Sequence, residues 1–111
     1  MKHIIIFHDA FANPTDYWYP QIKSILPAGY SVITPELPSG AQQGFTFWLK
    51  SLDQYKEIIN EETIIISHGI SSLLALSSLQ TFTQPIRNYI SVAGCAEPPA
   101  HLALAPIAET F

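Results

Sequence analysis

The chain alternates short apolar runs rich in β-branched residues with longer segments in which apolar residues recur every three or four positions. The short runs predict buried strands at residues 3–8, 30–35, 63–67 and 86–93. The longer segments predict helices at residues 14–26, 45–60 and 70–79. Right-handed crossovers then give an α/β fold, an open four-stranded parallel sheet with helices on both faces.

Proline and asparagine mark the expected ends of the helices. Asn13 is a good start for the first helix, although Pro20 should kink this helix or move its start later. Its buried face should carry Trp18, Ile22, Ile25 and Leu26. The second helix should end at Asn60 in a left-handed conformation, and a tail at 101–111 has helix formers interrupted by Pro106.

The third predicted strand stops abruptly at Ser67, and a helix-forming run begins at Ile70. Strand, tight turn and helix in this order are the setting of the nucleophile elbow, G-x-S-x-G. The outer positions of that motif must be small, as Ser67 and Ser71 are, because strand and helix approach closely there. The middle position should carry the attacking side chain, and it is Gly69. The sequence therefore predicts the scaffold of a serine hydrolase without its attacking oxygen.

Composition narrows the class of protein. With 111 residues, 48% of them hydrophobic and 13% charged, the chain suits one domain with a modest core. The net charge of −4 and the lack of Lys or Arg clusters argue against nucleic-acid binding. The apolar runs are far shorter than the ~20 residues of a membrane span. The single Cys95 argues against internal disulfides and suits a reducing cytoplasm.

Several motifs together resemble the small α/β-hydrolases of the retinoblastoma-binding-protein and YdeN type, a family of serine hydrolases, over roughly the first hundred residues. The first strand ends at His8, where the family has His-Gly, and His68 precedes the position of the family's nucleophile. Between them, the similarity rests on Trp18 with Pro20, on Glu36-Leu37-Pro38 and on Trp48-Leu49.

Three departures from the family pattern matter. Asp9 stands where the family has glycine in its oxyanion loop, and Gly69 stands where it has serine. The family also continues through two further strands, which bring the Asp and His of its catalytic triad. The resemblance thus implies a single, truncated hydrolase-like domain over residues 1–111.

The resemblance also implies the strand order 2-1-3-4, which makes the first and third strands central. Open parallel sheets bind ligands at the carboxyl ends of such strands. We therefore expect a catalytic-type corner at His68 and Gly69, joined by an oxyanion-type crevice formed by His8, Asp9, Ala10 and Ile70. The N–H groups that open the third helix favour an anion in this crevice.

Other assignments of chemistry stay open but have less support. Ser67 or Ser71 would serve as nucleophile only if the motif slipped. His8, His68 and Asp9 suit a metal by residue type, but their spacing matches no metal motif. No glycine motif for a nucleotide is present, and we expect neither metal nor cofactor. No motif surrounds His3, Cys95, Glu97 or His101, and core packing competes with pocket lining for Phe11, Tyr17, Trp18, Phe45 and Trp48.

Three functional interpretations follow. The favoured one is a catalytically degenerate hydrolase-like protein that binds a small anionic or ester-like ligand or a protein partner, because donors without a nucleophile accelerate hydrolysis by only about 10³-fold. The second is an active esterase-type hydrolase whose triad members come from another subunit or from non-standard residues. The third is a fragment of a longer hydrolase. In each case the fourth strand is an apolar edge, and we expect a homo-oligomer that covers it.

Overall fold

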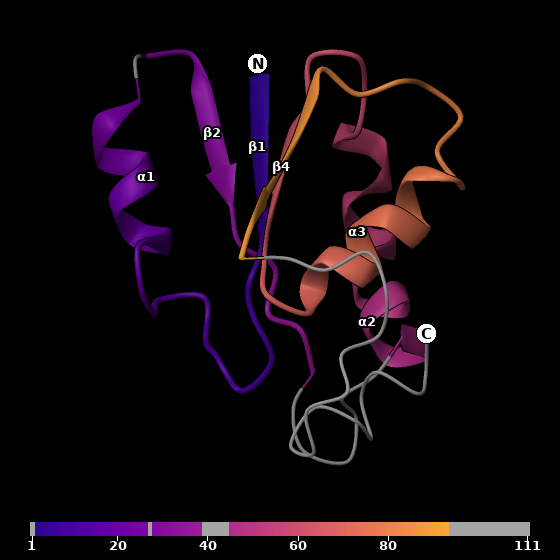
Figure 1. Cartoon of the computed structure of the whole chain (residues 1–111). Coiled ribbons are helices and arrows are strands. Elements are labelled where there is room, and N and C mark those ends of the chain that lie inside the picture. Colours follow the sequence, from indigo (N-terminus) through magenta and orange to yellow (C-terminus); the bar gives the residue numbers. More distant parts are fainter. Residues whose placement is uncertain (1, 27, 39–44, 94–111) are drawn as a thin grey trace.

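The computed structural model describes residues 2–26, 28–38 and 45–93. Its strands form a sheet of order β2-β1-β3-β4 in which every neighbouring pair is parallel (Figure 1). The predicted α/β fold and strand order are confirmed. The elements are β1 (Lys2–Phe7), α1 (Tyr19–Ile25), β2 (Tyr30–Ile33), α2 (Phe45–Ser51), the 3₁₀ helix η2 (Asp53–Ile58), β3 (Ile64–His68), α3 (Ser71–Leu79) and β4 (Asn88–Val92). Predictions for Cys95, Glu97, His101, Pro106 and the side chain of Phe45 lie outside the described residues.

Successive residues of β1 pack on opposite faces of the sheet. Ile4 and Ile6 lie in the smaller core, together with Tyr19 of α1. Ile5 and Phe7 lie in the larger core, which α2, η2 and α3 cover. Figure 1 shows this arrangement with the sheet almost edge-on, α1 on one side and α2 and α3 on the other. Both faces of β1 are therefore buried, as an unbroken apolar run predicts.

The register of the central strands decides which residues meet at the carboxyl rim of the sheet. Phe7 of β1 is aligned with Ser67 of β3. His8 follows Phe7 and His68 follows Ser67, so the two histidines lie at neighbouring places on this rim. β4 runs beside β3 as far as Val92, which is aligned with His68.

The first helix begins later than its predicted start at Asn13. α1 starts at Tyr19 with Pro20 in its first turn, where the missing N–H of proline removes no helical hydrogen bond. Asn13 instead closes a turn, because its N–H donates to Asp16 Oδ2 at 2.8 Å and its carbonyl accepts the Asp16 N–H at 3.0 Å. The predicted buried face was wrong at Ile25, which is 74% exposed.

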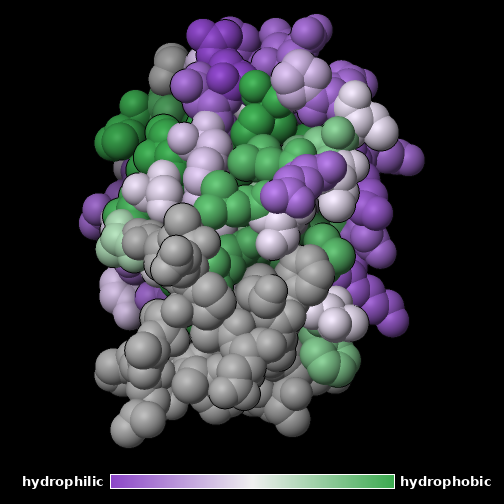
Figure 2. All heavy atoms as spheres, turned by 45° about the vertical axis from the view of Figure 1, so that its right-hand side comes forward, coloured by the Kyte–Doolittle hydropathy of each residue, from purple (hydrophilic) through white to green (hydrophobic). Residues whose placement is uncertain are grey.

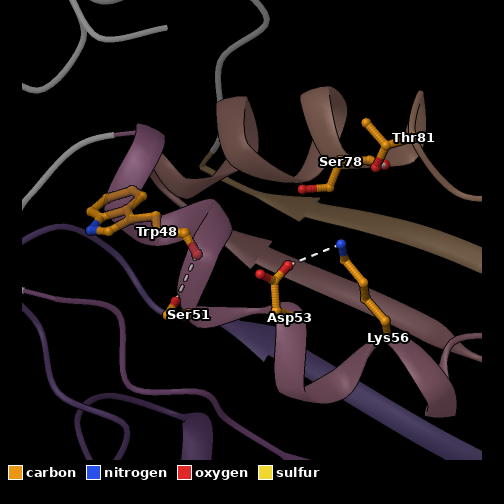
Figure 3. Close-up of polar contacts among 6 residues, drawn as sticks. All are labelled: Trp48, Ser51, Asp53, Lys56, Ser78 and Thr81. Carbon is orange, nitrogen blue, oxygen red and sulfur yellow. Dashed lines mark hydrogen bonds and ion pairs between the residues drawn. The ribbon is translucent and has the colours of Figure 1, made fainter.

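The second predicted helix is divided into α2 and η2, which was not expected. At the break, Ser51 Oγ donates to the Trp48 carbonyl at 2.7 Å, a side-chain bond that competes with the helical ladder. In η2, Asp53 pairs with Lys56 at 3.0 Å, since residues three apart eclipse one another in a 3₁₀ helix (Figure 3). Asn60 does not have the positive φ predicted for it.

The surface combines polar and apolar areas. Figure 2 shows one face, with hydrophobic residues near its centre and hydrophilic residues above and to the right. Large apolar side chains with substantial exposure include Ile90 of β4 and Leu76 of α3. Among the described helices, none has the length and hydropathy needed to cross a membrane.

Candidate functional site

Gly69 lies at the corner between β3 and α3, with a φ of +63°. This left-handed conformation costs about 1 kcal/mol for a residue that carries a Cβ, so it favours glycine. The N–H of Gly69 donates to the carbonyl of Val92 at 3.0 Å, which ties the corner to β4. The structure thus places the apex of the predicted elbow on the carboxyl rim of the sheet.

The carboxylate of Asp9 lies inside this corner. Its Oδ1 accepts the N–H of Ala10 at 2.8 Å and the N–H of Ile70 at 3.1 Å. In α/β-hydrolases, the N–H after the nucleophile and an N–H from an earlier strand's loop make the oxyanion hole. A Cβ added to Gly69 would overlap the Asp9 carboxylate. Asp9 therefore lies where the nucleophile's side chain would begin and uses the donors that an oxyanion would need.

His8 clamps the loops that follow the first two strands. Its side chain is 2% exposed, its Nδ1–H donates to the Asp9 carbonyl at 2.8 Å, and its Nε2 accepts the Leu37 N–H at 2.8 Å. These partners assign the neutral tautomer that carries its proton on Nδ1. Since both ring nitrogens are engaged, His8 has no free lone pair for a metal.

His68 lies against Tyr19, the first residue of α1. Its Nδ1 lies 2.7 Å from the hydroxyl of Tyr19, which itself accepts the Asp9 N–H at 3.0 Å. The Tyr19 hydroxyl therefore joins the backbone of Asp9 to the ring of His68. Burial raises the pKa of Tyr19 from 10.0 to about 12, so this hydroxyl keeps its hydrogen at neutral pH. Rings of Tyr17, Trp18 and Tyr19 surround His68 at centroid distances of 5.1, 5.6 and 5.7 Å.

The two serines that flank the apex are engaged elsewhere. Ser67 Oγ lies 2.6 Å from the Tyr89 hydroxyl. Ser71 Oγ lies 2.8 Å from the carbonyls of both Phe7 and His68 and accepts the His68 N–H at 3.1 Å. Both serines are fully buried. Neither hydroxyl is hydrogen-bonded to a histidine ring within the described residues, so neither has the partner that a serine nucleophile needs.

The corner offers little to a metal ion. Among residues 2–26, 28–38 and 45–93, no three or more His, Cys, Asp or Glu side chains are grouped so as to hold one. Of the three residues considered for a metal, His8 has both ring nitrogens hydrogen-bonded, and Nδ1 of His68 is hydrogen-bonded to the Tyr19 hydroxyl.

The aromatic side chains considered for a pocket separate into two groups. Phe11 and Tyr17 are 67% and 66% exposed and have positive φ values of 63° and 52°. Trp48 belongs to the larger core, and its indole N–H donates to the Pro38 carbonyl at 2.9 Å.

A hollow of about 250 Å³ lies beside the segments that precede β3 and β4. It is lined by Lys56, Ile59, Thr81, Phe82, Thr83 and Gln84.

Two tyrosines that the sequence did not single out hold the corner together. Tyr19 joins Asp9 to His68, and Tyr89 satisfies Ser67. Tyr89 is the register partner of Ile65, which lies two residues before Ser67 and therefore on the same face of the sheet. No pattern in the sequence indicated Tyr19, because the helix was expected to present Trp18 instead.

The sheet order and the strand-to-helix corner define a protein with a hydrolase-like α/β fold. The chain is similar to a protein of Bacillus subtilis (strain 168) named "Putative hydrolase YdeN", with 26% identity over 80 residues. The crystal structure of the ydeN gene product from B. subtilis superimposes with a TM-score of 0.76 and 25% sequence identity, over 87% of this chain. No family model matches the sequence.

The similarity covers only part of that relative. The matched region is 71% of this chain and 42% of YdeN, and the structural match covers 54% of the YdeN chain. The chain thus spans about half the length of the relative that it matches. The resemblance to hydrolases of the YdeN type is supported by these two comparisons.

Proposed function

We propose that this protein binds a partner or small ligand through a hydrolase-like fold and does not hydrolyse esters. The observation that carries the proposal is the Asp9 carboxylate beside Gly69, on the N–H groups of Ala10 and Ile70. An acyl transfer needs a hydroxyl at the apex and free donors for the developing oxyanion. At this corner glycine supplies no hydroxyl, and the donors already hold a carboxylate.

The Asp9 carboxylate does not replace the serine in this chemistry. If its free oxygen attacked an ester, the charge developing on the carbonyl oxygen would need the Ala10 and Ile70 N–H groups. Those groups are bound to Asp9 itself. The small anionic or ester-like ligand expected from the sequence meets the same competition, so a bound anion must displace Asp9 or lie elsewhere on the rim.

A fluorophosphonate probe tests the absence of serine chemistry. We expect no labelling of the native chain at concentrations that label an active serine esterase fully. Labelling would overturn the proposal in favour of an active hydrolase with an unusual nucleophile. Ser67→Ala and Ser71→Ala variants then identify the labelled residue, because they are the serines flanking the apex.

For the partner, we propose a second copy of this chain, bound at β4. Within the described sheet, β4 has a neighbour on one side only, and Ile90 on it is 48% exposed. Edge strands that carry apolar side chains and no charge add further strands readily.

A cytoplasmic location, predicted from the single Cys95, stays a prediction.

Light scattering after size exclusion tests this self-association. We expect the native chain to elute as a dimer or larger species, and Ile90→Lys to elute as a monomer because a lysine on the edge opposes pairing. Gln21→Lys, which adds the same charge at an exposed position of α1, is the matched control and should keep the native mass. A native chain that stays monomeric at high concentration would contradict the proposal.

A further inference from the structure

Two of the differences from the hydrolase pattern meet at one place in the structure. The elbow motif G-x-S-x-G would place serine at the Gly69 position, and Asp9 follows the neighbouring strand β1. These positions are 60 apart in the sequence, yet the Asp9 carboxylate lies where a side chain on residue 69 would start. The corner has room for one side chain, and it comes here from the loop after β1.

The backbone of Asp9 is held in a way that fixes this direction. Its N–H donates to the Tyr19 hydroxyl at 3.0 Å. Its carbonyl accepts the His8 Nδ1–H at 2.8 Å and the Ala12 N–H at 3.2 Å. With both backbone groups engaged, the side chain leaves the loop toward α3.

The carboxylate is also matched in charge to its place. Oδ1 accepts two backbone N–H groups, one of them from Ile70 at the start of α3. The amino end of a helix carries partial positive charge and favours an anion. The chain therefore supplies by itself the anion that this helix end would otherwise draw from solution.

We propose that Asp9 is the corner's own ligand, and that Gly69 is required because of it. Asp9 fills the space of a nucleophile's side chain and also accepts the two N–H groups that would bind an oxyanion. The corner is therefore closed to an external carboxylate or phosphate. A side chain at residue 69 is excluded while Asp9 is in place. This inference deepens the proposed function and rests on the absence of serine chemistry there.

Thermal unfolding of Gly69→Ala in three backgrounds tests the shared space. In the native chain, the new Cβ collides with Asp9 or expels it from its two N–H donors, and we expect a large loss of Tm. In Asp9→Ala the same change meets no carboxylate, so the loss should fall to the part caused by the positive φ of residue 69. Asp9→Asn is the matched control, because it keeps the size of the side chain and removes its charge, and the loss should stay large.

A loss of Tm that is equal in all three backgrounds would overturn the shared space. It would leave the proposed absence of serine chemistry standing, because that proposal is tested by the reaction of the native chain with the fluorophosphonate. If Gly69→Ala does not fold in the native background, recovery of folding in Asp9→Ala supports the inference, and failure to fold in Asp9→Ala overturns it.

Acetate as a probe tests the closed donors separately. We expect acetate to raise the Tm of Asp9→Ala, because a ligand that binds only the folded state stabilises it. Sodium chloride at the same ionic strength is the control for general salt effects. The native chain should show no difference between the two salts. An acetate-specific rise in the native chain, or none in Asp9→Ala, would contradict the inference.

Discussion

The ends of β1 and β3 look alike in sequence and differ in what they hold. Each strand leads to a histidine at the carboxyl rim, which is His8 for β1 and His68 for β3. His8 is buried with both ring nitrogens bonded, and it fixes the loop that carries Asp9. His68 is half-buried, and its ring is hydrogen-bonded to Tyr19 through Nδ1.

The two strand ends contribute different parts to one corner. The β3 side keeps the positive φ of an elbow but has no side chain at its apex. The β1 side supplies a carboxylate to the same space and to the same helix end. In this chain, the backbone of the corner comes from β3 and α3, whereas the side chain inside it comes from the loop after β1.

The largest expected effect separates the two histidines. His8→Ala removes a buried ring. The Leu37 N–H then has lost its acceptor, and the Asp9 carbonyl has lost one of its donors. We expect a loss of about 2–4 kcal/mol in the free energy of unfolding, measured by urea denaturation. His68→Ala, the matched comparison, should cost about 1 kcal/mol because its ring has partial access to water. Equal losses would mean that the two corners do not differ as described.

A smaller effect tests the hydroxyl that links the corners. Tyr19→Phe removes the acceptor of the Asp9 N–H and the hydrogen bond to His68, and we expect a loss of about 1 kcal/mol in the free energy of unfolding at pH 8. Because burial raises the pKa of Tyr19 from 10.0 to about 12, the unfolded chain releases this proton at lower pH than the folded one. The stability of the native chain should therefore fall as pH rises from about 10 toward 12.

Urea midpoints at pH 8 and pH 11 measure this linkage. Tyr19→Phe lacks the titrating hydroxyl, so its stability should fall less than that of the native chain over this interval. The same fall in both proteins would show that the Tyr19 proton does not contribute to stability.

The strands and their order could be predicted because the signals are local or follow from the resemblance. The unbroken apolar run of β1 and the stop after Ile66 need no knowledge of the remaining fold. The helix at residues 45–60 was predicted as continuous because its apolar spacing suits both α2 and η2. The break depends on the Ser51 hydroxyl, which periodicity does not register.

The contents of the corner could not be predicted in the same way. Sequence reasoning expected Asp9, Ala10, Gly69 and Ile70 on one rim, and in the structure the Asp9 carboxylate contacts the other three. It expected a space open to a ligand, whereas the carboxylate of Asp9 fills it. The direction of one short side chain depends on the Tyr19 and His8 bonds to its backbone, which come from residues up to 10 positions away.

One hydrogen bond extends the reach of this corner to the edge of the sheet. The amide of Gly69 donates to the carbonyl of Val92, the last residue of β4. A strand added beside β4 would lie one hydrogen bond away from the turn that carries Gly69. The rate of deuterium exchange at the Gly69 amide would then report both on assembly at β4 and on whether Asp9 occupies the corner.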